Sequence, residues 1–256
     1  MSDYLQKGKS VLFCGTPCHN AALKNFLHRE YTQLIQCDFI CRGVNSPLVF
    51  RKYLDMLEKE YGGTVKSVQF KNKDNGWHCF GTKIEFTNGN TYYKDRYHDL
   101  FMVGYLEHNL FVRPSCHHCH FKGESRFSDI TLGDFWGIEN VCKEMDQDKG
   151  TSVIMVSTGK GKALLEKACV GLQNKEMDIT QAGSGNLCLG NAIEIGKKRE
   201  AFFKEIDLPF EVLMKKYAKK QHQIKGILVG LAHKTGLTPY LKRLWRKQHE
   251  SIGNKR

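Results

Sequence analysis

A strand, a short helix and a second strand open the chain, and this order constrains the fold more than any other feature. The apolar segment 9–14 (KSVLFC) predicts a buried strand, 21–30 (AALKNFLHRE) a helix, and 34–40 (LIQCDFI) a second buried strand. Four apolar residues share one face of that helix, namely Ala22, Leu23, Phe26 and Leu27. Such a unit gives two parallel strands joined by a right-handed crossover. The sequence therefore predicts an α/β fold with a partly parallel sheet and flanking helices.

Residues 64–95 predict an antiparallel insertion in this fold. Apolar and polar side chains alternate in TVKSVQFK and FGTKIEF, and the pair that begins at Asn88 (Asn-Gly) supplies a tight turn before the next strand. A helix over 47–61 precedes the insertion, with Ser46 as its N-cap. A second helix at about 97–110 follows the insertion.

The remaining segments complete the expected domain organisation. Residues 128–137 and 151–157 predict two more strands, and 161–170 predicts a helix. We expect residues 1–196 to form one α/β domain that binds cofactors. Residues 197–256 are expected to form a basic helical tail.

The composition places the chain among globular proteins. With 256 residues and 41% hydrophobic content it can bury a sizeable core. The amino terminus has no apolar stretch of secretory length, and no run approaches the roughly 18 apolar residues that span a bilayer. We therefore expect a cytoplasmic protein.

The net charge of +12 is concentrated in the tail. From Lys197 onward lie 16 of the 39 Lys and Arg residues but 5 of the 27 Asp and Glu residues. A basic tail suits an acidic partner protein, an anionic membrane surface or RNA, and charge alone does not choose among them. A solvated helical face is an equally good interpretation. Nucleic acid is less expected, because few aromatic residues that could stack on bases are interleaved with these charges.

Ten cysteines are more than packing requires, and a reducing cytoplasm argues against disulfides. Cys18 and Cys41 follow the carboxyl ends of the first two predicted strands, the edge where parallel sheets bind their ligands. Cys116 and Cys119 form a C-x-x-C pair, a spacing that lets both sulfurs reach one metal ion or cluster. The sequence therefore predicts a single metal centre held by these four thiolates.

Zinc and an iron-sulfur cluster both suit four cysteine thiolates, and the spacing does not exclude zinc. Three histidines crowd the same loop, namely His117, His118 and His120. We favour the cluster because structural zinc usually staples small modules, whereas these cysteines are expected at the functional edge of an α/β sheet. The alternative is a zinc-stabilised binding protein without redox activity.

The other six cysteines are expected to be structural or free. Cys14 and Cys37 lie inside apolar strands, where a free cysteine usually behaves as a small buried hydrophobe. No second argument supports a role for Cys79, Cys142, Cys169 or Cys188.

Four segments, taken together and in order, resemble a known family. They are FCGTPCHNAALKNFL (13–27), CDFICRGVNSP (37–47), RPSCHHCHFKGESRFSDITLGDFWG (113–137) and DKGTSVIMV (148–156). The chain is similar to the coenzyme F-420 hydrogenase/dehydrogenase beta-subunit family over about residues 8–220. Members of that family carry FAD and a 4Fe-4S cluster, and they exchange a hydride with the deazaflavin coenzyme F-420 or with another substrate.

The resemblance implies an oxidoreductase. It makes Cys18, Cys41, Cys116 and Cys119 the ligands of one 4Fe-4S cluster, the same four that the strand ends and the C-x-x-C spacing indicate. It also implies that FAD exchanges a hydride with a small-molecule substrate, while the cluster passes electrons to or from a ferredoxin-like protein. It assigns no residue as catalytic.

The flavin site implied by the resemblance uses glycines and polar groups of the same segments. A glycine loop before a helix offers backbone amides to phosphates, and nearby polar side chains would contact the ring or the phosphates. The candidates are Gly15, Thr16, Lys24, Arg126, Gly133, Asp134, Lys149, Gly150 and Ser152. A turn or a salt bridge explains each of them equally well.

The chain departs from the family in two respects, of which the second is the basic helical tail. Most relatives begin well upstream of this point, often with a ferredoxin-like region that has a C-x-x-C-x-x-C-x-x-x-C-P pattern and then with further strands of the flavin domain, and this sequence has neither. We expect either a separate cluster-bearing subunit that supplies the missing part, or a shortened relative that keeps the cluster without flavin catalysis. The basic tail would contact such a partner or, peripherally, a membrane.

Overall fold

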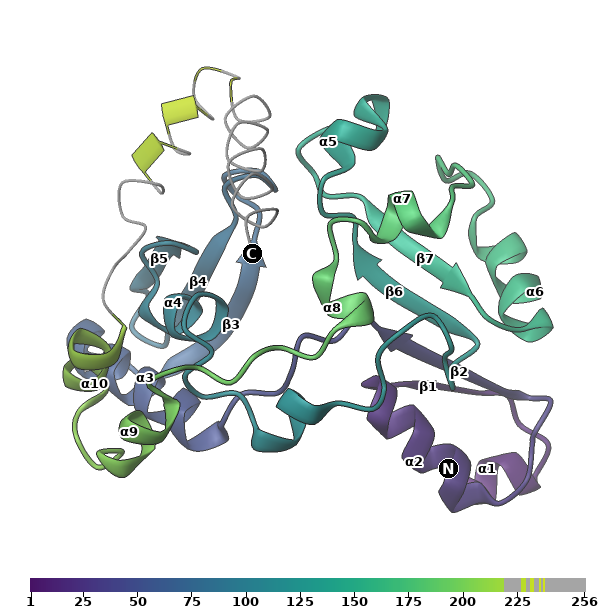
Figure 1. Cartoon of the computed structure of the whole chain (residues 1–256), viewed down its shortest axis with the longest axis horizontal. Helices are drawn as coiled ribbons and strands as arrows, with labels where there is room; N and C mark the ends of the chain where they lie inside the picture. Colours follow the sequence, from purple (N-terminus) through teal and green to yellow (C-terminus); the bar gives the residue numbers. More distant parts are fainter. Residues whose placement is uncertain (219–226, 229–230, 233–234, 236, 238–256) are drawn as a thin grey trace, which may run out of the picture. The chain divides into compact units, whose positions relative to one another are not determined.

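A computed structural model of the chain describes residues 1–218, 227–228, 231–232, 235 and 237 (Figure 1). These residues form two compact units that alternate along the chain. The first unit contains residues 1–42, 118–146 and 150–193, and the second contains 43–117, 147–149 and the described residues from 194 onward. Much of the predicted tail therefore lies outside the described residues.

The first unit is built on a four-stranded sheet. Its strands, in spatial order, are β1 (Val11–Cys14), β2 (Leu34–Phe39), β6 (Ile130–Asp134) and β7 (Ser152–Val156). Strands β1, β2 and β6 run parallel, and β7 runs antiparallel to β6. The predicted α/β fold with a partly parallel sheet is confirmed.

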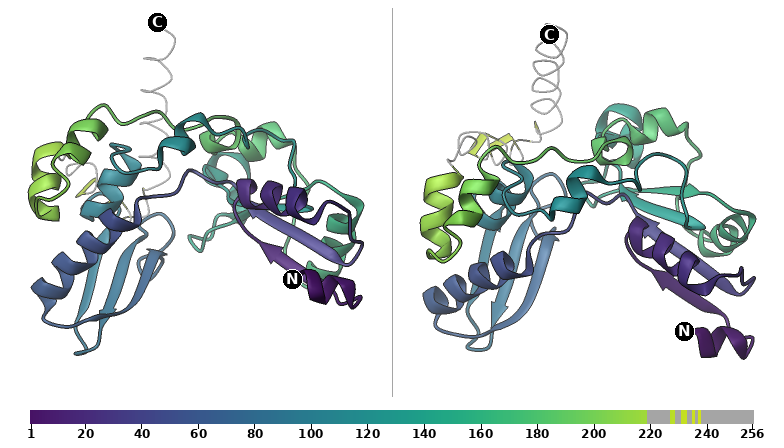
Figure 2. Two further views of the ribbon diagram at one scale, coloured as in Figure 1. Left: turned by 90° about the horizontal axis from the view of Figure 1, so that it is seen from below. Right: turned by 60° about the horizontal axis from the view of Figure 1, so that its bottom comes forward.

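Short helices flank this sheet. They are α1 (Ser2–Gln6), α2 (Pro17–Leu27), α5 (Ile138–Val141), α6 (Gly159–Ala168), α7 (Ile179–Gly183) and α8 (Leu187–Gly190), with a 3-10 turn η2 (Lys143–Met145). Helix α2 lies along one face of β1 and β2 (Figure 2). Helices α5 and α7 pack on β7 over the same face through Ile138, Val153 and Ala182.

Helix α2 packs through residues other than the expected apolar ones. Phe26 is 72% exposed, and the buried residues of the helix are Pro17, Asn20 and Ala21. The reason is a polar contact, because the buried Asn20 amide bonds to the sheet and draws this side of the helix inward. Apolar periodicity therefore predicted the helix correctly but not the face that it buries.

The opposite face of the sheet is largely uncovered by the residues that the structure describes. Side chains alternate between the two faces along each strand, and paired residues of neighbouring strands project from the same face. The register therefore shows which side chains of the four strands lie on this face. Five apolar side chains on this face are 40% to 65% exposed, namely Leu12, Phe39, Leu132, Ile154 and Val156, whereas Ile130 on the same face is buried.

The second unit contains an antiparallel three-stranded sheet. Its strands are β3 (Val65–Asn72), β4 (Gly81–Phe86) and β5 (Thr91–Asp95). The helices of this unit are α3 (Pro47–Tyr61), α4 (Leu100–Leu106), α9 (Arg199–Lys204) and α10 (Phe210–Tyr217), with the 3-10 turn η1 (Pro114–His118). The antiparallel character predicted for residues 64–95 is confirmed.

One aromatic core joins the sheet of the second unit to its helices. Tyr53, Phe101, Phe111 and Phe202 are fully or almost fully buried in it. The Tyr53 ring stacks on Phe101, and the ring of Phe111 meets those of Phe101 and Phe202 at a tilt. Helix α4 is shorter than the predicted 97–110: it starts later because Asp99 caps its first turn, and it ends earlier, at Leu106. Within the described part of the chain, no helix has the length and apolar character needed to cross a bilayer.

Asp99 connects the start of α4 to this core. Its carboxylate is completely buried, accepts from the Met102 amide at 2.7 Å, and accepts from the hydroxyls of Tyr53 and Tyr92 at 2.7 Å each. Burial raises the pKa of Asp99, although these three donors oppose the shift.

Replacing Asp99 by alanine is expected to remove the cap and leave two buried phenols without their acceptor. We predict a loss of roughly 3 kcal/mol or more in the free energy of unfolding, measured by urea denaturation. Asp178→Ala is the control, since Asp178 caps α7 on the surface by accepting from the Thr180 amide at 2.7 Å. That cap should be worth about 1 kcal/mol. Equal losses in the two variants would show that the buried network adds nothing.

Candidate cofactor site

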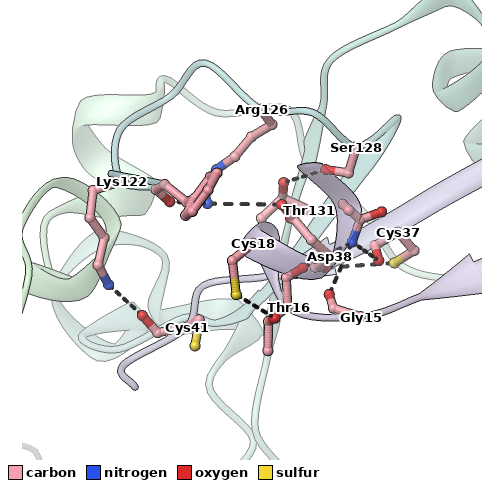
Figure 3. Close-up of polar contacts among 12 residues, drawn as sticks. Gly15, Thr16, Cys18, Cys37, Asp38, Cys41, Lys122, Arg126, Ser128 and Thr131 are labelled. Carbon is pink, nitrogen blue, oxygen red and sulfur yellow. Dashed lines mark hydrogen bonds and ion pairs between the residues drawn. The ribbon is translucent and has the colours of Figure 1, made fainter. Parts of the chain in front are cut away.

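The carboxyl ends of β1, β2 and β6 meet at one edge of the sheet because the three strands are parallel. The Gly15–Cys18 loop follows β1 and Cys41 follows β2 at this edge. Gly133 and Asp134 end β6 there, and the antiparallel β7 begins there at Ser152. Seven of the residues singled out in the sequence therefore lie along one edge of the first unit, and Figure 3 labels Gly15, Thr16, Cys18 and Cys41 among them.

The loop after β1 is fixed in place by its own helix. Thr16 is the N-cap of α2, accepts from the His19 amide, and lies 3.0 Å from the Cys18 sulfur through its hydroxyl. Pro17 occupies the first helical position, where its missing N–H costs nothing. This local arrangement places Cys18 in the first turn of α2, where its thiol is exposed.

Asn20 joins this loop to the neighbouring strand and was not singled out in the sequence. Its amide nitrogen donates to the carbonyls of Gly15, Thr16 and Cys37 at 3.1 to 3.2 Å. Its side-chain oxygen accepts from the Gln36 amide group at 3.1 Å. Asn20 is completely buried, so these contacts hold the loop to β2 in a place that water does not reach.

The chain returns from this edge to the start of β6 over the face that α2 also covers, without a crossover helix. Lys122 donates to the Cys41 carbonyl near the carboxyl edge. Arg126 lies beside Asp38, the last residue but one of β2. Asp129 then exchanges hydrogen bonds with the backbone of Gln36, accepting at 2.8 Å through its carboxylate and donating at 2.8 Å through its amide. Residues 119–129 are thus held to β2 along its length.

A buried ion pair forms the centre of this return segment. The Arg126 and Asp38 side chains are both inaccessible to solvent, and Nη1 lies 3.9 Å from Oδ2 (Figure 3). Burial raises the pKa of Asp38, while the positive charge of Arg126 opposes the shift. Nε and Nη2 of Arg126 and both carboxylate oxygens of Asp38 have no hydrogen-bond partner among the described residues. Polar atoms buried in this way are suited to a polar ligand.

The predicted metal ligands fall in both units. Cys18, Cys41 and Cys119 belong to the first unit, and Cys116 belongs to the second, where its sulfur accepts from the Val44 amide at 3.4 Å. All ten cysteines are free thiols. Among the described residues, no three His, Cys, Asp or Glu side chains stand close enough together to hold a metal ion.

Several of the flavin candidates already have structural roles. Lys24 is exposed and pairs with Glu30 at 3.6 Å. Gly133 leaves room for Ile40, since an added Cβ would lie 2.6 Å from the Ile40 Cδ1 atom. The Asp134 carbonyl accepts from the Asn186 amide at 2.8 Å.

The candidates around residue 150 are divided between the units. Lys149 lies in the second unit, where its carbonyl accepts from the Lys73 ammonium at 2.8 Å. Gly150 adopts a φ of 84°, which favours glycine. Ser152 is exposed at the start of β7.

Cys14 and Cys37 are not the buried side chains that the sequence predicts. Cys14 is exposed and Cys37 is half-buried. The reason is that both side chains lie on the sheet face that described residues leave largely uncovered.

One family model matches the chain over residues 8–181, and it describes the C-terminal part of the beta subunit of coenzyme F420 hydrogenase/dehydrogenase. No curated protein matches the chain.

The pair formed by Asp38 and Arg126 should be coupled in stability. Arg126→Met and Asp38→Leu each leave one uncompensated buried charge and are expected to cost about 3–5 kcal/mol in urea denaturation. The double variant removes both charges and should cost clearly less than the sum of the two. Lys24→Met, which breaks an exposed pair, should change stability by less than about 1 kcal/mol. Additive losses would contradict a direct interaction between Arg126 and Asp38.

Proposed function

Because the chain belongs to the family defined by the C-terminal part of the coenzyme F420 hydrogenase/dehydrogenase beta subunit, we propose that it is an iron-sulfur flavoprotein oxidoreductase. In this proposal FAD exchanges a hydride with a small-molecule substrate or the deazaflavin coenzyme F-420. One 4Fe-4S cluster relays electrons to or from a ferredoxin-like protein or a separate cluster-bearing subunit. The observation that carries the proposal is the set of cysteines and polar groups that follow parallel strands at one edge of the sheet.

The donor set suits an iron-sulfur cluster. Cys18, Cys41, Cys116 and Cys119 are free thiols, and thiolates are the usual ligands of such clusters. The Val44 amide donates to the Cys116 sulfur, and the Thr16 hydroxyl contacts the Cys18 sulfur. Hydrogen bonds to ligand sulfurs are one means by which proteins set a cluster's potential. The proposal requires that the four sulfurs come together when the cluster binds.

Arg126 is the best supported of the flavin contacts. Its guanidinium is buried, permanently charged, and has two nitrogens without a described partner, which suits a phosphate or a carbonyl of the cofactor. The start of α2 at Thr16 offers fewer free backbone N–H groups to a cofactor phosphate than the sequence indicates. The Gly15 and His19 amides already donate to Cys37 and Thr16, and Pro17 has no N–H.

A flavin beside a cluster links two-electron hydride exchange to the transfer of single electrons. The chain itself supplies positions and charge. Asn20 holds the Cys18 loop to β2, and Lys122 holds the Cys41 carbonyl to the return segment. The ion pair with Asp38 holds the Arg126 guanidinium in place, and both side chains are shielded from water.

An acidic electron-transfer partner suits the basic tail. Two lysines in its described part are already paired within the chain, Lys204 with Glu200 at 2.8 Å and Lys216 with Glu205 at 2.6 Å. Of the tail's 16 Lys and Arg residues, ten follow residue 218 in the sequence, as does one of its five Asp and Glu residues. In this proposal that excess of positive charge attracts the partner and speeds its association.

The ligand assignment can be tested by replacing single cysteines in anaerobically purified protein. Cys116→Ser and Cys119→Ser should lose most of the bound iron, because serine replaces a thiolate ligand with a poorer one. Cys79→Ser is the control and should keep its iron, since Cys79 lies outside the proposed set. Equal iron in all three variants would overturn the assignment. Zinc in place of iron in the parent protein would favour the non-redox alternative.

The contact of Thr16 with the Cys18 sulfur can be tested separately from its role as a helix cap. Thr16→Ala and Ser46→Ala each remove a hydroxyl N-cap that precedes proline, from α2 and α3 respectively. Both should lose about 1 kcal/mol of stability. Only Thr16→Ala should also shift the absorption spectrum or reduction potential of the bound cofactors, because only Thr16 contacts a proposed ligand sulfur. Identical spectra and potentials in the two variants would remove Thr16 from the site.

A further inference from the structure

Two cysteines outside the proposed cluster site face each other across neighbouring strands. Cys14 in β1 and Cys37 in β2 are paired residues in the parallel register, so their side chains project from the same face of the sheet. Neighbouring strands lie about 4.8 Å apart, and the Cα atoms of disulfides are usually about 4.4–6.8 Å apart. The backbone therefore already holds these two cysteines at a spacing that a disulfide tolerates.

Reagents can reach this pair on the described surface. Cys14 is exposed and Cys37 is half-buried. The neighbouring side chains on that face include Leu12, which is 65% exposed, and Phe39, which is 41% exposed. Most cysteines with a purely structural role are shielded from solvent, and Cys14 is not.

We infer that Cys14 and Cys37 form a reversible thiol-disulfide pair, which is oxidised by a low-molecular-weight disulfide. Nothing in the proposed flavin and cluster chemistry uses these two sulfurs. The pair adds a second redox site on the sheet face opposite the one that α2 covers.

The two thiols differ in a way that orders the reaction. Burial, together with the neighbouring Cys14, raises the pKa of Cys37 to about 11. The Cys37 thiol donates to the Asp38 carbonyl oxygen, with 3.6 Å between sulfur and oxygen. Cys37 is therefore protonated at neutral pH and reacts slowly with a reagent from solution. The exposed Cys14 is the thiol that reacts first.

The chemistry balances without another reactant. The Cys14 thiolate attacks one sulfur of the small disulfide, forms a mixed disulfide, and releases one small thiolate. Cys37 then loses its proton and attacks the Cys14 sulfur, which expels the second small thiolate. Two protein thiols are oxidised by two electrons, one small disulfide is reduced to two thiols, and an excess of small thiol reverses both steps.

The test is peptide mapping after treating the full-length protein anaerobically with oxidised glutathione. Remaining thiols are alkylated, and the protein is digested with trypsin without reduction. Cleavage after Lys and Arg gives one peptide over 10–24 and another over 30–42, each with two cysteines. We expect these two peptides to be linked, and fragmentation between Cys14 and Cys18 should place the bond at Cys14.

Matched variants distinguish this bond from one between the proposed ligands. The linked peptides should be absent from Cys14→Ser and from Cys37→Ser, should persist in Cys18→Ser and Cys79→Ser, and should separate after dithiothreitol. Cys37→Ser should instead accumulate a glutathione adduct on Cys14. A bond between Cys18 and Cys41, a link that survives in Cys14→Ser, or no link in the parent protein would overturn the inference.

Discussion

Parallel pairing of β1, β2 and β6 is the constraint on which the rest of the first unit depends. Parallel strands cannot be joined by tight turns, so the chain must return to the same end of the sheet before each new strand. Helix α2 makes the first return, and the irregular segment 119–129 makes the second. The loops that open at the carboxyl edge carry the proposed ligands as a direct result of this geometry.

The two returns are held by different chemistry. Asn20 attaches α2 to β2 through a fully buried side-chain amide. The second return has no regular structure to satisfy its polar groups, so it relies on Lys122, Arg126 and Asp129 at successive positions along β2. Polar contacts of this kind are specific in direction, and they keep two loops in register with the sheet edge.

The sequence predicts what depends on local pattern and misses what depends on neighbours. Hydrophobic runs and caps indicated β1, α2, β2 and α3 because each element's signal lies within its own segment. The position of Cys18 and Cys41 followed, since the order of strands fixes the edge. Cys14 was predicted to be buried and Phe26 to lie on the packed face of α2, but both are exposed. A run of apolar residues does not show whether another layer of the protein covers it. The contact of Arg126 with Asp38 joins residues far apart in the chain, and no local pattern marks it.

The proposed function is tested most directly by the composition of anaerobically purified protein, with iron, sulfide, zinc and flavin determined on one sample and absorption recorded before and after dithionite. We predict about four iron and four sulfide per chain together with released FAD, and a spectrum that bleaches on reduction. One zinc per chain in a colourless protein would contradict the proposed function.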